Sequence, residues 1–97
     1  MASSKEYFEY VLEQLSQVEG LRWRPMMGEF LLYCRNKVVG GVYDDRLLVK
    51  PTRSACARLP DAAWEEPYPG GKPMLLVTEM ENKGFLRELL EAVSEEV

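Results

Sequence analysis

Few residues in this sequence carry side chains that could do chemistry. The chain has 97 residues and no histidine, which excludes Ser-His-Asp and Cys-His catalysis and any metal site that needs an imidazole ligand. Cys34 is followed by Arg35, and a neighbouring cation lowers a thiol pKa. No histidine stands ready to activate that thiol, however, and a buried cysteine in a strand is the simpler interpretation.

The carboxylates and glycines also fail to indicate an active site. Asp44 and Asp45 are the only adjacent aspartates. Neighbours on a strand point to opposite faces, so we expect a solvated turn there rather than an acid–base pair. No EF-hand spacing occurs, and the Pro69–Lys72 segment is too short for a phosphate loop. We therefore predict no enzyme activity, no catalytic residue, no metal and no cofactor.

Length and composition favour one small globular domain over residues 1–97. Hydrophobic residues make up 46% and charged residues 29% of the chain, an ordinary globular balance. The first residues lack the apolar stretch of a signal peptide, and no run is long enough to span a membrane. Cys34 and Cys56 form no C-x-x-C pair. Two free thiols in a reducing compartment are favoured over a disulfide, so we expect a cytoplasmic protein.

The helices are predicted from hydrophobic spacing. Ser3 and Ser4 both offer N-caps, Ser3 and Glu6 fit a capping box, and Gly20 can end the helix that follows. Asn82 can cap a last helix. Each helix has one apolar stripe, made of Tyr7, Phe8, Val11, Leu12, Leu15 and Val18 in the first and of Phe85, Leu86, Leu89, Leu90 and Val93 in the last.

Strands are predicted in between, at residues 21–24, 30–35, 38–43, 46–50 and 74–78. Their short connections require antiparallel neighbours. We expect turns at Asn36-Lys37 and Asp44-Asp45, a bulge or close approach at Gly40-Gly41, and a short helix capped by Thr52. The order is a helix, three or four strands, a short helix, one or two strands and a long helix. We predict an α+β fold, a two-layer sandwich with helices on one face of an antiparallel sheet.

Charge is distributed unevenly along the chain. The net charge is −4, yet residues 21–60 carry eight basic and three acidic side chains. One interpretation is that the basic sheet attracts the acidic helices of the same molecule. The other is that a basic sheet face contacts an acidic protein or a nucleic acid. Because the whole chain is acidic, we expect a protein partner in preference to nucleic acid.

The segment 24–30, the tyrosine at 33 and the segment 39–50 together resemble the TfoX N-terminal domain family, which includes the Sxy/TfoX regulators of natural competence. The matching positions are Arg24, Met26, Gly28, Phe30 and Tyr33, while Met27, Glu29 and Leu31 replace a phenylalanine, a glycine and a small residue. The resemblance implies an α-β(3)-α-β(2)-α order similar to type III secretion chaperones. It also implies a regulatory role through a protein partner, such as a transcription regulator.

One sheet face is predicted to be left for a partner. In the 30–35 strand, Leu31 and Tyr33 point away from Phe30 and Leu32, and two helices cover only one face well. We predict a homodimer or a heteromeric contact through the second face, to which Val39 is also assigned. The candidate partner-binding residues are Arg22, Arg24, Glu29, Leu31, Tyr33 and Leu48.

Two alternatives to that contact stay open. The irregular segment 61–73, with Trp64 and Tyr68, can fold back over the second face and leave a monomer. The chain can also be a nucleic-acid-associated factor that uses its basic 21–60 segment.

Overall fold

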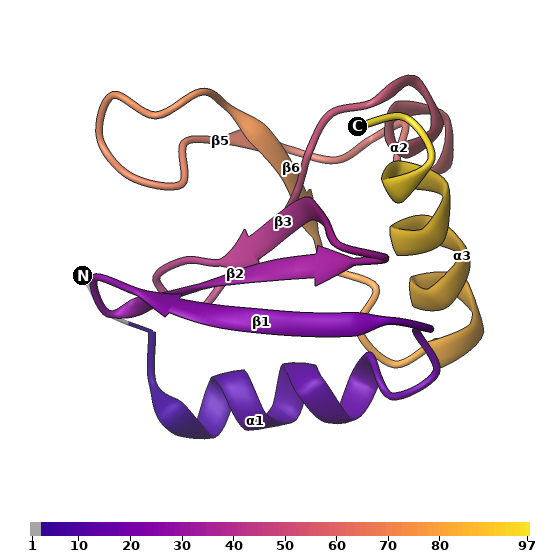
Figure 1. Cartoon of the computed structure of the whole chain (residues 1–97). Helices are drawn as coiled ribbons and strands as arrows, with labels where there is room; N and C mark the ends of the chain where they lie inside the picture. Colours follow the sequence, from indigo (N-terminus) through magenta and orange to yellow (C-terminus); the bar gives the residue numbers. More distant parts are fainter. Residues whose placement is uncertain (1–2) are drawn as a thin grey trace.

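A computed structural model describes residues 3–97, which form a six-stranded antiparallel sheet with three helices (Figure 1). The strands lie in the order β1-β2-β3-β4-β6-β5. In chain order the elements are α1 (Lys5–Gln14), β1 (Leu21–Met26), β2 (Glu29–Cys34), β3 (Lys37–Val42), β4 (Leu47–Val49), α2 (Arg53–Arg58), β5 (Trp64–Glu65), β6 (Met74–Val77) and α3 (Lys83–Ser94).

The α+β prediction is confirmed, but the α-β(3)-α-β(2)-α order is wrong by one strand. Four strands precede α2, because the three-residue β4 pairs with both β3 and β6 and joins the two halves of the sheet. The four strand segments read from the apolar runs before residue 51 are therefore all present. The order implied by the family resemblance lacks one strand before α2. A strand of three residues is easily omitted from such an order, although β4 lies in the middle of the sheet.

Two-residue turns connect the first four strands. Met27-Gly28, Arg35-Asn36 and Asp44-Asp45 have positive φ at both positions, from 52° to 85°. Such turns are of type I′, whose twist matches that of the flanking strands. The turn predicted at Asp44-Asp45 is confirmed. The turn predicted at Asn36-Lys37 lies one residue earlier.

A side-chain cap begins each helix. Ser4, Thr52 and Asn82 each accept a hydrogen bond from the backbone amide three residues further on. The caps predicted at Thr52 and Asn82 are confirmed. The capping box predicted at Ser3 is wrong, because the Ser3 hydroxyl donates to the Glu29 carboxylate instead.

The helices pack on one face of the sheet and enclose the main core. Figure 1 shows α1 along β1 at the bottom of the view and α3 at the right-hand side of the sheet. The Phe8 ring stacks on Phe30 with centroids 3.7 Å apart, and Trp23 meets Phe8 edge-on at 4.9 Å. Most of the two predicted stripes is buried here, with Val11 of α1, Leu15 directly after it and Leu86, Leu89, Leu90 and Val93 of α3 fully enclosed. The helix end predicted at Gly20 is wrong, because α1 ends at Gln14.

A β-bulge in β3 changes which side chains reach this core. Leu32 and Tyr33 pair with Gly40 and Val38, so Val39 is the extra residue. Val39 therefore points into the helix-side core and is fully buried. Its assignment to the opposite face is wrong, because simple alternation does not hold across a bulge.

Candidate functional site

The open face is the side of the sheet away from the helices, and the strand register determines which side chains share it. Residues that pair across an antiparallel ladder point to the same side. Two rows result, one of Arg22, Tyr33 and Val38 and one of Arg24, Leu31, Gly41, Leu48 and Leu76. Arg22, Arg24, Leu31 and Tyr33, four of the six candidate residues, are therefore neighbours.

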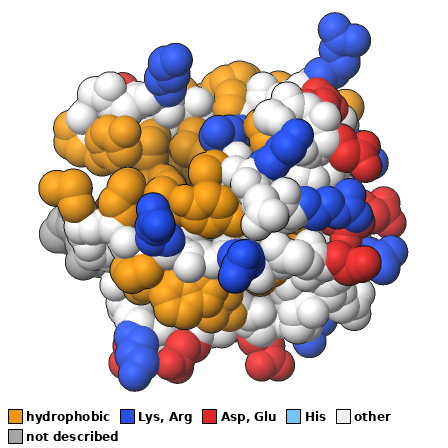
Figure 2. All heavy atoms as spheres, in the orientation of Figure 1, with side chains coloured by type: hydrophobic (Ala, Val, Ile, Leu, Met, Phe, Trp, Pro, Cys, Tyr) orange, Lys and Arg blue, Asp and Glu red, His pale blue; other side chains and the backbone are white. Residues whose placement is uncertain are grey.

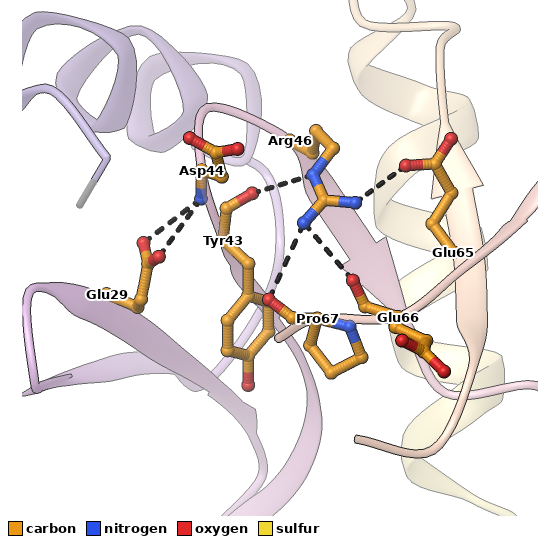
Figure 3. A network of polar contacts seen from close by, with 7 residues as sticks. All are labelled: Glu29, Tyr43, Asp44, Arg46, Glu65, Glu66 and Pro67. Carbon is orange, nitrogen blue, oxygen red and sulfur yellow. Dashed lines mark hydrogen bonds and ion pairs between the residues drawn. The ribbon is translucent and has the colours of Figure 1, made fainter. Parts of the chain in front are cut away.

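The β5–β6 loop, residues 66–73, extends over part of this face and is held by Arg46. The Arg46 guanidinium donates to the Glu65 carboxylate at 2.6 Å and to the carbonyls of Glu66 and Pro67 at 3.2 and 3.5 Å. Its Nε donates to the Tyr43 carbonyl at 3.0 Å. Figure 3 shows this guanidinium between the β3–β4 turn and the start of the loop. One side chain thus fixes where the loop begins.

A small second core lies under the loop. Tyr43 is 4% exposed, and its ring crosses the face so closely that a Cβ on Gly41 would lie 2.6 Å from it. Tyr68 of the loop packs on Tyr43 with centroids 6.4 Å apart. Leu48 and Met74 complete the buried cluster, with Leu31 and Leu76 at its margin.

Two of the six candidate residues make contacts within the chain that stabilise the fold. Leu48 is fully buried as part of this second core and offers no surface to a partner, so that assignment is wrong. Glu29 accepts hydrogen bonds from the Asp44 amide and from Ser3, as Figure 3 shows for Asp44. Its carboxylate therefore secures two chain segments beside the open face.

The alternative in which residues 61–73 cover the face is partly realised. Pro67 and Gly71 are buried, and Tyr68 contacts Tyr43. Trp64 takes no part, because it pairs with Leu75 and so belongs to the helix side of β5. A groove of about 680 Å³ remains between the loop and the strands.

The groove is apolar with a basic margin. Leu31, Val38 and Tyr43 line it from the sheet, Tyr68 and Met74 from the loop side, and Lys50 and Lys72 add positive charge. A pocket of about 350 Å³ adjoins it, lined by Arg22, Trp23, Arg24, Tyr33 and Asn36. Figure 2 shows hydrophobic side chains gathered on this side with basic ones among them, while acidic side chains lie towards the edges.

Some basic residues around the sheet are paired with carboxylates and others are not. Arg35 forms ion pairs with Glu91 and Glu95 next to α3, at 3.5 and 3.8 Å. Within residues 3–97, no carboxylate lies within 4 Å of the charged groups of Arg22, Arg24, Lys50 or Lys72. Attraction between layers thus accounts for Arg35, whereas the open face keeps free cations.

Both cysteines are free, and Cys34 is buried. Burial raises the pKa of the Cys34 thiol and outweighs the opposing effects of Ser94 and Arg35. Among residues 3–97, no three cysteine or carboxylate side chains converge on a metal position. No helix there is long and apolar enough to cross a membrane.

Sequence reasoning did not identify Tyr43 or Lys50 as residues of the open face, nor the contacts by which Arg46 fixes the start of the 66–73 loop. Alternation along β4 could have placed Arg46, Leu48 and Lys50 on one face. The fold-back of Tyr43 and the contacts of Arg46 with carbonyls depend on loop geometry, for which the sequence carries no local signal.

Comparison with known proteins provides one similar sequence. The chain is 36% identical over 72 residues to a protein of Spirochaeta aurantia called "Uncharacterized 12.7 kDa protein in trpE 5'region". The match covers 74% of this chain and 63% of that protein, so this chain spans less than two thirds of its relative. No protein-family model and no solved structure matches.

Proposed function

We propose that this chain is a non-enzymatic regulatory module that binds a protein partner through the open face, as a TfoX N-terminal-like domain of the cytoplasm. Two of the residues that carry the resemblance, Arg24 and Tyr33, support this, since both lie on that face. A transcription regulator is the class of partner that the resemblance suggests. The secretion-chaperone-like fold is part of the same proposal.

One observation carries the proposal, namely that the open face combines an apolar groove with free cations. Tyr68 and Met26 are 55% and 37% exposed there, and Arg22, Arg24, Lys50 and Lys72 surround the apolar surface. Apolar area supplies affinity, and charge that is unpaired in the monomer supplies selectivity for an oppositely charged partner. A face of this kind suits binding better than solvation.

A protein partner fits this face better than nucleic acid. Trp23, the aromatic residue between the two arginines, packs on Phe8 on the helix side, so its ring does not offer a base a stacking surface on the open face. The net charge of −4 also opposes long-range attraction of a polyanion.

Affinity capture from an extract of the source organism tests the proposal. Arg22→Glu/Arg24→Glu should lose a partner that the parent retains, and Arg53→Glu/Arg87→Glu, which makes the same charge change in the helix layer, should keep it. Capture that survives reversal of Arg22 and Arg24, or no selective capture at all, would overturn the proposal.

Sedimentation equilibrium tests a second copy as the partner. A two-fold contact through the open face would place the unpaired cations of both copies in one interface, and like charges oppose such a contact. We therefore expect a monomer of 11.2 kDa at tens of micromolar. A dimer that Tyr33→Glu dissociates without loss of the fold would instead identify the partner as a second copy.

A further inference from the structure

We infer that the open face binds an extended acidic segment in which an apolar side chain is flanked, two residues away on each side, by carboxylates. This inference rests on the proposed function and specifies the chemistry of the partner.

The first step is the placement of the cations relative to the groove. The row that starts at Arg22 on β1 continues through Tyr33 and Val38. Lys50 follows β4, where its amide donates to the carbonyl of Val39, and its side chain lines the groove. Positive charge therefore stands at both ends of a row whose middle is a tyrosine and a valine.

The second step is the length of this row. Neighbouring strands lie about 4.8 Å apart, so β1 and β4 are separated by about 14 Å. An extended peptide advances about 3.3 Å per residue, so its residues i and i+4 are about 13 Å apart. The side chains of residues i, i+2 and i+4 share one face. Acidic residues at i and i+4 therefore match the cations, and residue i+2 falls over Tyr33, Val38 and the groove.

The third step concerns what else the face could accept. Among residues 3–97, no carboxylate lines either the groove or the adjoining pocket, so a basic segment finds no partner there. The groove is closed on one side by Tyr68 and Met74, which gives an apolar side chain contacts on several sides. Two adjoining hollows of about 680 and 350 Å³ suit a few side chains of an extended segment better than a broad folded surface.

Fluorescence anisotropy with short labelled peptides tests the inference. The probe carries the core Asp-Ser-Phe-Ser-Asp between glycines. One control replaces both Asp by Asn, and a second has the same composition with the two Asp adjacent, which destroys the spacing. We expect the probe to bind about tenfold more tightly than either control. A gain of this size in affinity is what one desolvated charge pair provides.

Protein variants place the binding on the open face. Arg22→Glu and Lys50→Glu should each weaken the probe about tenfold, whereas Arg87→Glu, in the helix layer, should leave it unchanged. Amide chemical-shift changes in the ¹H-¹⁵N spectrum should be confined to strands β1 to β4, Lys50 and residues 66–73.

Several results would overturn the inference. These are equal affinity for the Asn or permuted control, shifts on the helix side, no binding by the probe, or a single-stranded oligonucleotide that occupies the same residues where the peptide does not. If the peptides fail while Arg22→Glu/Arg24→Glu still abolishes capture of a partner, the proposed function stands and the extended acidic segment is wrong. If the peptides bind and no partner is captured selectively, the extended acidic segment stands and the proposed function is wrong.

Discussion

The two faces of the sheet are both buried in part, but by different means. On the helix side, α1 and α3 contribute continuous apolar stripes to one large cluster. On the open side, Tyr43, Leu48 and Met74 form a cluster of three buried residues under a loop that Arg46 anchors. The helix side derives its stability from packed area, whereas the open side depends on a few polar contacts. We therefore expect substitutions on the open side to cost the fold less than substitutions in the main core.

The largest expected effect compares one substitution on the two faces. Leu89→Ala leaves a cavity between α3 and the sheet, which rigid neighbours cannot fill, and should cost about 2–5 kcal/mol. Leu48→Ala should lie at the low end of that range, because the loop above Leu48 can settle into the space. Thermal unfolding measures both, and Glu88→Ala on the exposed face of α3 is the control. Equal losses at Leu89 and Leu48 would mean that the open-side cluster is as rigid as the main core.

A smaller effect is expected from Gly41→Ala. The added methyl would lie 2.6 Å from both the Phe30 carbonyl oxygen and the Tyr43 ring, so Tyr43 must move, at a cost of about 1–3 kcal/mol. Denaturant unfolding measures this loss. Gly84→Ala meets only ordinary contact and should be neutral or stabilising because alanine favours a helix. A Gly41→Ala protein as stable as the parent would show that the Tyr43 ring is not held where we describe it.

Next in size is the release of the loop by Arg46→Gln. The variant loses charge-assisted hydrogen bonds to Glu65 and to two carbonyls, and we expect a loss of about 1–2 kcal/mol from a partly exposed site. Hydrogen exchange should accelerate in residues 66–73 while α3 amides stay protected. Uniform acceleration would instead mean that the two faces unfold as one unit.

The smallest expected effect is a loss of stability at alkaline pH, where the Tyr43 phenol ionises. Burial raises the pKa of its phenol, with Tyr68 and Glu29 adding to the shift, so the folded state favours the neutral form. The resulting stabilisation is complete below about pH 10, the unfolded value, and is lost as pH rises through the folded value. Tyr43→Phe keeps the ring and removes the ionisation. Between pH 9 and 11 its melting temperature should fall less steeply than that of the parent.

Local chemistry allowed much of the helix side to be predicted from the sequence. Thr52 and Asn82 are caps because their side chains satisfy free amides, and the stripe of α3 is buried because its spacing presents one face. The open side was harder to predict. The bulge at Val39 reversed one assignment, and Leu48 is buried in a cluster with Met74, which lies 26 positions further along the chain. Arg22, Arg24, Leu31 and Tyr33 were found together because plain alternation holds in β1 and β2.

The three type I′ turns also set an order of assembly. They join β1 to β4 through pairings between residues close in sequence, and hairpins of this kind form in about 1–10 μs. The pairing of Val49 with Leu75 must close a much longer stretch of chain, and closure entropy slows such a contact. We expect the first four strands to associate before β6 arrives. The loop between β5 and β6 would then dock last, so the part of the open face that it covers is the final surface to be completed.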